Sequence, residues 1–312
     1  MSTSSLIAPE TALPTVSFEL FPPRGTESDD AVWARIRRMA EAGPDFFTVT
    51  YGASGSARTS SDAIVHRLLA ETHVPVVAHL TCVGATRAEL TARVRDLLDA
   101  GVRDFLALRG DPPAGQTRWV PDPEGVAGSA DLVRLIREVH SARSATGDVT
   151  VAVAAYPSGR NSGPGEIAAL REKQAAGADY AVTQVFYDAE DYATLVRDAR
   201  AAGVTLPIVP GILPMTERRR LARLEELTGV PVPLSLDALL DVRDDAVRLR
   251  RGLDATLALI DRVLAVGAPG LHLYTFNRDR PALDVLDHLR ARGVLNPALV
   301  SSGATPASAA PA

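Results

Sequence analysis

The sequence contains one cysteine, Cys82, and one lysine, Lys173. A single cysteine excludes an internal disulfide and a metal cage built from several cysteines. No apolar run approaches the ~20 residues of a membrane span, and no basic segment followed by an apolar one resembles a secretory signal. Lysine and arginine total 33 against 38 acidic residues, which gives a net charge of −5 without a run of five like charges. We therefore expect a cytoplasmic protein that binds neither nucleic acid nor membranes.

Several familiar catalytic motifs are also missing. The sequence has no Gly-x-Ser-x-Gly nucleophile motif and no Walker A loop. No histidines are paired at metal-ligand spacing, and His79 with Cys82 would supply only two ligands. The only lysine falls in a predicted helix, which argues against a Schiff-base lyase or aldolase. What remains is a protein without a metal, for which proton transfer assisted by an organic cofactor is a plausible chemistry.

Short apolar runs alternate with amphipathic segments of helix length. Eight runs have strand character: Val16–Phe21, Phe46–Tyr51, Val76–Thr81, Phe105–Leu108, Val149–Tyr156, Tyr180–Tyr187, Pro207–Leu213 and Leu271–Phe276. Most are continuously apolar, as is typical of parallel strands that are buried on both faces. Eight strand–helix units predict an α/β fold, a closed (β/α)8 TIM barrel, rather than an open sheet. The long interval between the seventh and eighth runs predicts a helical insertion between those strands.

The two ends of the chain have a different composition. Residues 1–14 and 301–312 are rich in Ser, Thr, Ala and Pro and lack periodicity. Such segments bury too little apolar surface to offset the entropy of ordering them. We therefore expect one catalytic barrel domain over residues 15–300, between two disordered tails.

In such barrels the catalytic residues lie at the carboxyl ends of the strands and in the loops that follow. Glu19 lies inside the first apolar run, where a carboxylate is costly to bury without a partner. It is either a structural partner of Arg24 or Arg109, or a general acid that its apolar strand keeps partly protonated.

Other polar residues at the strand ends each allow a functional and a structural interpretation. Asp111 is either a functional carboxylate or the cap of a turn. His79 is either a site residue or a core histidine, and Tyr156 either contacts a ligand or packs. Gln184 interrupts an apolar run, and the ring edge of a ligand would supply the partners that a buried amide needs.

The strand ends match those of a known family, in order and through all eight strands. The matching strings are Ser17-Phe18-Glu19-Leu20-Phe21-Pro22-Pro23-Arg24, Val49-Thr50-Tyr51-Gly52-Ala53, His79-Leu80-Thr81-Cys82, Leu108-Arg109-Gly110-Asp111, Ala155-Tyr156-Pro157, Ala176-Gly177-Ala178, Ile208-Val209-Pro210-Gly211-Ile212 and Leu273-Tyr274-Thr275-Phe276-Asn277-Arg278. From about residue 16 to residue 289 the chain thus resembles the methylenetetrahydrofolate reductases, flavin-dependent barrel enzymes of one-carbon metabolism and methionine biosynthesis.

The resemblance implies a reaction and a set of roles. In that family NAD(P)H reduces FAD, and 5,10-methylenetetrahydrofolate then takes the hydride to become 5-methyltetrahydrofolate, in a ping-pong sequence. By resemblance Glu19 is the general acid that opens the folate's five-membered ring, and Asp111 is a second catalytic residue beside the flavin. Gln184 and Arg278 match substrate-binding positions. The cofactor-binding positions that match are Thr50 (on the nicotinamide side), Tyr51, His79, Arg109, Gly110, Asp111, Tyr156, Glu166 and Lys173. The resemblance also implies a homo-oligomer.

The chain departs from the family pattern in places, and these departures keep alternatives open. After Tyr156 the family usually has a histidine and a longer loop, whereas residues 158–165 are shorter and contain none. Glu172 replaces a basic residue, and Gly128 and Arg218 replace aromatic ones. One alternative is a flavin-independent relative that passes hydride directly from NADH or NADPH to the folate. Arg160 could contact the pyrophosphate of FAD or the phosphates of a nicotinamide nucleotide. A more remote alternative is a non-catalytic barrel that binds folate or flavin.

Overall fold

The computed structural model describes residues 2–7, 13–22, 28–51, 56–110, 120–143 and 147–295. One sheet contains nine parallel strands: β1 (Thr15–Leu20), β2 (Phe46–Val49), β3 (Val76–Thr81), β4 (Asp104–Leu108), β5 (Thr150–Ala155), β6 (Tyr180–Thr183), β7 (Ile208–Val209), β8 (Gly211–Ile212) and β9 (Gly270–Tyr274). Their order in the sheet is β7-β6-β5-β4-β3-β2-β1-β9-β8. The predicted (β/α)8 architecture is confirmed.

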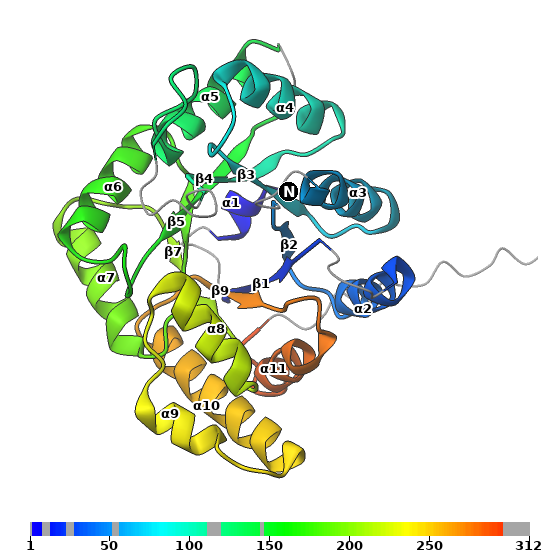
Figure 1. Ribbon diagram of the computed structural model, residues 1–312, viewed down its shortest axis with the longest axis vertical. Helices are drawn as coiled ribbons and strands as arrows, with labels where there is room; N and C mark the ends of the chain where they lie inside the picture. Colours follow the sequence, from blue (N-terminus) through cyan, green and yellow to red (C-terminus); the bar gives the residue numbers. More distant parts are fainter. Residues whose placement is uncertain are drawn as a thin grey trace, which may run out of the picture.

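Helices surround the strands as an outer ring, and α1 lies within that ring (Figure 1). They are α1 (Thr3–Leu6), α2 (Asp29–Glu41), α3 (Ser56–Glu71), α4 (Arg87–Asp99), α5 (Ser129–Ser141), α6 (Pro164–Ala175), α7 (Ala189–Ala201), α8 (Arg218–Thr228), α9 (Leu234–Leu240), α10 (Asp245–Ala265) and α11 (Asp279–Ala291). In the described part of the chain, none of these helices has the length and apolar character needed to cross a membrane.

The seventh predicted strand consists of two short strands, because Pro210 has no amide hydrogen to continue the ladder. β7 pairs with β6, and β8 pairs with β9. The two halves of the predicted seventh strand therefore lie at the two ends of the strand order, where the barrel closes. Gly211 permits this closure: a Cβ there would lie 2.2 Å from the Thr183 carbonyl oxygen. The sixth strand ends at Thr183 rather than at the predicted Tyr187.

The predicted insertion between the seventh and eighth strands is also confirmed. It comprises α8, α9 and α10, which lie together at the lower left of Figure 1. Arg218 at the start of α8 donates to both carboxylate oxygens of Asp237, at 2.8 and 2.6 Å, and to Asp241 at 2.6 Å. Arg218 therefore fastens α8 to α9, and this gives a structural role to an arginine at a position where the family pattern has an aromatic residue.

Strand alternation separates two cores. Phe18 and Leu20 of β1 face the helices and belong to the large outer core. Ser17 and Glu19 face the opposite way, into the barrel. The inner core consists of Ile7, Phe46, Val77, Leu106, Ala152, Tyr180, Val182 and Val209. The apolar part of the barrel interior is thus continuous with the amino-terminal segment.

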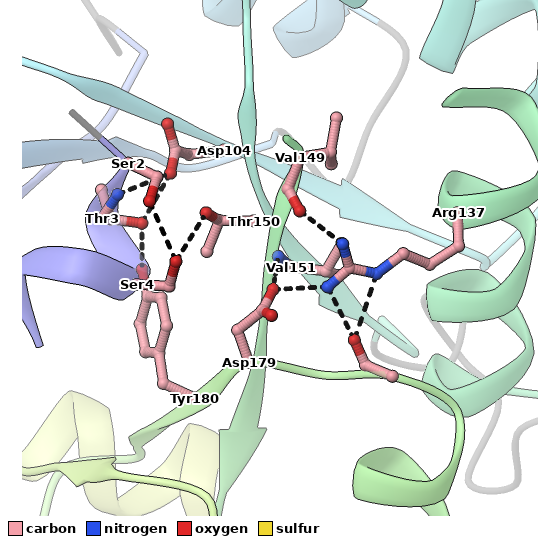
Figure 2. A network of polar contacts seen from close by, with 11 residues as sticks. Ser2, Thr3, Ser4, Asp104, Arg137, Val149, Thr150, Val151, Asp179 and Tyr180 are labelled. Atoms are coloured by element: carbon pink, nitrogen blue, oxygen red, sulfur yellow. Dashed lines mark hydrogen bonds and ion pairs between the residues drawn. The ribbon is translucent and has the colours of Figure 1, made fainter. Parts of the chain in front are cut away.

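The prediction of a disordered tail over residues 1–14 is wrong for residues 2–7. The Thr3 amide and hydroxyl both donate to Asp104 Oδ1, at 2.9 and 2.7 Å, and Tyr180 donates to the Thr3 hydroxyl at 3.3 Å. The hydroxyls of Ser4 and Thr150 lie 3.2 Å apart (Figure 2). Ile7 is fully buried. Hydrogen bonds to the amino ends of β4, β5 and β6 therefore order a segment that has no helical periodicity. The predicted tail 301–312 lies outside the described residues.

Candidate active site

Glu19 is held at the carboxyl-terminal half of the barrel interior by two neighbouring strands. The register pairs it with Thr48 of β2 and with Tyr274 of β9. Its Oε1 accepts from the Thr50 hydroxyl at 2.9 Å, and its Oε2 lies 3.1 Å from His272 Nε2. The residue is 7% exposed. Within the described residues, His272 and Thr50 are therefore the hydrogen-bond partners of Glu19, and the expected partner Arg24 lies outside the described residues.

The electrostatics of Glu19 differ from the expectation. Burial raises the pKa of Glu19, but the hydrogen bond from His272, the charges of His79 and His272 and the Thr50 hydroxyl outweigh it, and the pKa lies below its usual value. Burial also lowers the pKa of His79 to about 4, so His79 is uncharged near neutrality and does not lower the pKa of Glu19 there. The His272 hydrogen bond is the largest of the effects that lower the pKa of Glu19. The prediction of a carboxyl kept protonated by its apolar strand is therefore wrong in direction.

Two buried polar atoms beside Glu19 have no hydrogen-bond partner among the described residues. They are Thr48 Oγ1 and His79 Nε2, and both residues lie on strands whose inward faces meet in the barrel. An unpartnered buried polar atom costs about 1–3 kcal/mol. Such atoms at the carboxyl end of a barrel indicate a place where a bound molecule supplies the missing partners.

At the mouth of the barrel above Glu19, the Asn277 side chain links the segment after β9 to the segment after β1; we call this link the clasp. Asn277 accepts from the Phe21 amide at 2.8 Å and donates to the Phe21 carbonyl at 2.6 Å. Phe276 and Asn277 both have positive φ, 51° and 57°, which non-glycine residues rarely adopt. The clasp stacks Phe276 on Phe21 with ring centroids 4.7 Å apart, and the Arg220 guanidinium lies 4.7 Å from the Phe276 centroid. A flat aromatic wall thus borders the mouth.

A cleft of about 430 Å³ opens beside the ends of β4 and β5. Its lining includes Arg109, Tyr156, Glu166 and Lys173, together with Gly128, Ser129 and Asn161. Gly128 and Gly163 are the N-cap residues of α5 and α6, and neither helix has a side chain that caps its amides. The lining also holds three cations, Arg109, Arg134 and Lys173, beside three acidic residues, Asp131, Glu166 and Glu172. Uncapped helix amides and these cations suit an anionic group such as a pyrophosphate.

Glu166 and Lys173 form a buried pair on α6. Their Oε1 and Nζ atoms lie 3.6 Å apart, and Lys173 donates to the Ala154 carbonyl at 2.7 Å. Burial raises the pKa of Glu166 to about 7, although Lys173 opposes the shift. Burial likewise lowers the pKa of Lys173. The Lys173 Nζ lies 5.8 Å from the Tyr156 ring centroid, so the pair and the aromatic ring belong to one wall of the cleft.

The other predicted site residues occupy the same end of the barrel. Thr50 and Tyr51 follow β2, and the Arg93 guanidinium lies 5.7 Å from the Tyr51 centroid. Gly110 follows β4 with φ +88°, and a Cβ there would lie 2.6 Å from Val83 Cγ1. Glycine is therefore required at this turn. Asp111 lies outside the described residues.

Two predicted substrate-binding residues follow β6 and β9. The Gln184 side-chain oxygen accepts from the Val185 amide at 2.9 Å. Arg278 is exposed and forms an ion pair with Glu217. Arg160, which we expected on a cofactor phosphate, instead donates to the Glu226 carbonyl at 3.0 Å.

Sequence reasoning missed His272 and Ser17. His272 is fully buried, its Nδ1 lies 2.9 Å from the Ser17 hydroxyl oxygen, and its ring stands edge-on to Tyr274. A signal was present: His272 and Tyr274 alternate with Leu271 and Leu273, as Ser17 and Glu19 alternate with Phe18 and Leu20. Closure of the barrel places these two polar faces side by side.

Comparisons with known proteins point to one family. Residues 6–290 match the family model for methylenetetrahydrofolate reductase. The chain is 35% identical over 269 residues to the Escherichia coli 5,10-methylenetetrahydrofolate reductase, covering 84% of this chain and 86% of that one. It is 34% identical over 288 residues to the Zea mays methylenetetrahydrofolate reductase (NADH) 1, covering 88% of this chain but about half, 48%, of the maize protein.

A solved structure shares the fold at low sequence identity. It is an uncharacterized Clostridium thermocellum protein that binds two copies of 5-methyl-5,6,7,8-tetrahydrofolic acid, with a TM-score of 0.61 and 14% identity over 91% of this chain and 96% of that one. The match to the family model extends over nearly the whole described barrel and includes every strand that carries the candidate site. The chain belongs to the methylenetetrahydrofolate reductase family.

Proposed function

We propose that this protein reduces 5,10-methylenetetrahydrofolate to 5-methyltetrahydrofolate, with NADH or NADPH as the source of the hydride. The observation that carries the proposal is Glu19: a buried carboxyl group in the barrel interior, with both oxygens held by hydrogen bonds and unpartnered polar atoms beside it. Methylene-folate needs an acid because its five-membered ring opens only when the bridging nitrogen N10 is protonated. The Clostridium thermocellum neighbour, which binds a methyl-folate, supports a folate as the ligand of such a barrel.

Glu19 would supply that proton. As a general acid it is worth about 10²–10⁴-fold in rate. The O–H bond of Glu19 breaks, N10 gains the proton, and the C–N10 bond opens to leave an iminium at N5. Folate binding also excludes water from the mouth, and loss of water favours the neutral acid over the carboxylate. This effect opposes the hydrogen bonds that lower the pKa of Glu19 in the open barrel.

Gln184 and Arg278 would orient the folate. The Gln184 carboxamide oxygen is held by the Val185 amide, which leaves its NH₂ group to donate to the ring edge of a pterin. Arg278 lies in the exposed loop after β9, where its guanidinium would suit a carboxylate of the folate tail. The stacked Phe21 and Phe276 rings would offer an apolar surface to the folate at the mouth.

We assign FAD to the cleft beside β4 and β5. Its pyrophosphate would meet the uncapped amides of α5 and α6 and the Arg109 side chain, and Glu166 Oε1, buried without a hydrogen-bond partner, would accept a hydroxyl of the ligand. Tyr51, His79, Gly110, Tyr156 and Lys173 occupy the remaining positions that we assign to the cofactor, with Thr50 on the nicotinamide side. When bound, FAD would accept the hydride from the nicotinamide and deliver it to the methylene carbon. Asp111 is proposed beside the flavin from sequence alone.

One observation favours a second candidate, direct hydride transfer without flavin. Arg160 is the only cation in the loop 157–163, and its guanidinium is engaged with the Glu226 carbonyl of α8. This loop therefore contributes Asn161, but no positive side chain, to the lining of the cleft.

The visible spectrum of the purified protein separates the two candidates. Flavin bands that remain with the protein, bleach with NADH or NADPH and recover with methylene-folate support the ping-pong route. A colourless protein that oxidises the nicotinamide and forms 5-methyltetrahydrofolate, identified by mass spectrometry, supports direct transfer. A folded, FAD-supplemented protein that forms no methyl-folate with either nicotinamide contradicts both.

A further inference from the structure

Two arginines share one carboxylate at the mouth of the barrel. Glu217, the residue before α8, forms an ion pair with Arg278 through Oε1, and its Oε2 lies 3.2 Å from an Arg220 nitrogen. Arg220 lies deeper than Arg278, with 16% of its side chain exposed against 54%. Its guanidinium also lies 4.7 Å from the centroid of the Phe276 ring. Two guanidinium groups and one carboxylate thus border the aromatic surface that we assign to the folate.

The two guanidinium groups repel each other, and Glu217 offsets this repulsion. Burial lowers the pKa of Arg220, the charge of Arg278 lowers it further, and the charge of Glu217 opposes both effects. Each oxygen of Glu217 contacts a different arginine, so one carboxylate bridges the pair. A guanidinium binds carboxylates with strong, charge-assisted hydrogen bonds. The bridge therefore shows which chemical group this part of the mouth accepts.

The backbone on both sides of Glu217 is fixed to the inserted helices, whereas its carboxylate is held by the arginine pair. The Met215 amide donates to the Thr256 hydroxyl of α10 at 2.9 Å, and Arg218 fastens the start of α8 to α9. A Cβ at Gly252 would lie 2.1 Å from the Met215 carbonyl oxygen, so this segment lies directly against α10. Glu217 is the N-cap residue of α8, yet its side chain accepts no hydrogen bond from the helix amides. The carboxylate can therefore leave the arginines by rotation of the side chain alone.

We propose that Glu217 is an internal competitor for the tail of the folate. The inference rests on the proposed function, in which Arg278 binds a carboxylate of that tail. The tail ends in a glutamate with an α- and a γ-carboxylate, which match the two guanidinium groups that Glu217 bridges. On binding, these carboxylates take the places of Glu217 Oε1 and Oε2. Glu217 turns toward the amino terminus of α8, where the helix dipole favours a negative charge.

The exposure of the pair keeps the competition weak. A solvent-exposed ion pair contributes little, so Glu217 should weaken the binding of a charged tail only about three- to fivefold. A ligand with an uncharged tail has no carboxylate to exchange and leaves Glu217 on the arginines. Glu217 is therefore a specificity residue, because a ligand must bring negative charge of its own to use the arginine pair.

The test compares the KM of two forms of methylene-folate, the monoglutamate and an analogue in which both glutamate carboxylates are amides. Glu217→Gln should lower the KM of the monoglutamate about three- to fivefold and leave kcat and the KM of the diamide unchanged. Glu226→Gln is the matched control, because it removes the same charge from α8 at a residue that pairs with Arg223. It should change neither KM value.

A double substitution shows whether the effect acts through Arg278. In an Arg278→Leu background, Glu217→Gln should lower the KM of the monoglutamate by less, because the carboxylate and the tail no longer compete for that guanidinium. An equal decrease in both backgrounds overturns the proposal, as does an equal decrease for the diamide or an unchanged KM in folded Glu217→Gln.

Equilibrium binding separates this inference from the proposed function. The Kd of 5-methyltetrahydrofolate monoglutamate should also fall about three- to fivefold in Glu217→Gln, and this measurement does not depend on turnover. If that Kd falls but the FAD-supplemented wild-type protein forms no methyl-folate, the proposed function fails and the competition stands. If the wild-type protein reduces methylene-folate and the Kd is the same in both proteins, the competition fails and the proposed function stands.

Discussion

The two ends of the barrel interior each bury a carboxyl group, and they treat it differently. At the amino ends of the strands Asp104 is 6% exposed, and it accepts two hydrogen bonds from Thr3, which also receives the Tyr180 hydroxyl (Figure 2). At the carboxyl ends Glu19 is 7% exposed and is held by Thr50 and His272. Equal burial thus does not distinguish a structural carboxyl from a functional one.

The distinction lies in the neighbours. The side chains of Thr3, Asp104 and Tyr180 all have hydrogen-bond partners. Beside Glu19, Thr48 Oγ1 and His79 Nε2 are buried without a hydrogen-bond partner among the described residues. A closed end of a barrel satisfies its own polar groups, whereas an end that binds ligands leaves some for the ligand to satisfy. By the same principle we expect the amino end to contribute stability and the carboxyl end to bind the ligand.

The amino end has a second polar cluster that fixes helix to strand. Arg137 of α5 donates to the Val149 carbonyl at 2.5 Å and to Asp179 at 2.6 Å, and Asp179 accepts from the Val151 amide at 2.6 Å (Figure 2). These contacts tie α5 to the beginning of β5. Because α5 also contributes its opposite end to the cleft, rigidity at the amino end positions Ser129 and the uncapped amides there.

The strongest test of the contrast exchanges each carboxyl for an amide. Glu19→Gln should lower folate reduction about 10²–10⁴-fold while leaving the free energy of unfolding nearly unchanged. Asp104→Asn is the matched control: it should leave kcat intact and cost about 1–2 kcal/mol of stability by weakening charge-assisted bonds. Steady-state kinetics and urea unfolding measure both. Loss of activity in fully folded Asp104→Asn would contradict a purely structural role for Asp104.

The next effect concerns the segment that closes the amino end. Ile7 is fully buried in the inner core beside Tyr180 and Val209. Ile7→Ala should lower the free energy of unfolding by about 2–5 kcal/mol, because it leaves a cavity in the core. The kcat of the folded fraction should not change. An unfolding midpoint equal to that of the wild type would show that α1 does not dock in solution.

A smaller effect is expected at Gln184. Gln184→Ala should raise the folate KM about tenfold through loss of one hydrogen bond to the substrate, with little change in the NAD(P)H KM. Gln174→Ala is the control, because Gln174 accepts from the Thr205 amide at 2.6 Å on the outside of the barrel. It should reduce stability and leave the folate KM unchanged. Equal folate KM values in both variants would exclude Gln184 as a contact.

The barrel could be predicted because its strands are continuous apolar runs separated by helices of regular period. Pro210 split one strand because a missing amide breaks a ladder without breaking the apolar run. The docked segment at residues 2–7 escaped prediction for the opposite reason. Thr3 and Ser4 are ordered by hydrogen bonds to Asp104 and Thr150, over 100 residues away, and such partners leave no local pattern.

The candidate site was predictable where position along a strand determines it. Glu19 and His79 were singled out because they lie at the strand ends, whereas Thr50 was assigned only by its resemblance to the family. The hydrogen-bond partners of these residues were harder to predict, because His272 reaches Glu19 only when the barrel brings β9 beside β1. The direction of the pKa of Glu19 was missed for the same reason: burial can be predicted from one strand, but hydrogen bonds from the next strand cannot.

The smallest effect tests how charge in the cleft depends on pH. The pKa of Glu166 is raised to about 7 by burial, so this carboxyl is neutral below that pH and negative above it. The cleft therefore becomes less positive as the pH rises through 7, and its affinity for an anionic dinucleotide should fall less than about tenfold over that range. Glu166→Gln should abolish this dependence, measured by FAD titration at several pH values. If the affinity of Glu166→Gln for FAD still falls with pH, another group is responsible for the titration. If the dependence is lost, the buried Glu166 carboxyl acts on ligand binding, whereas the buried Asp104 carboxyl acts on the stability of the fold.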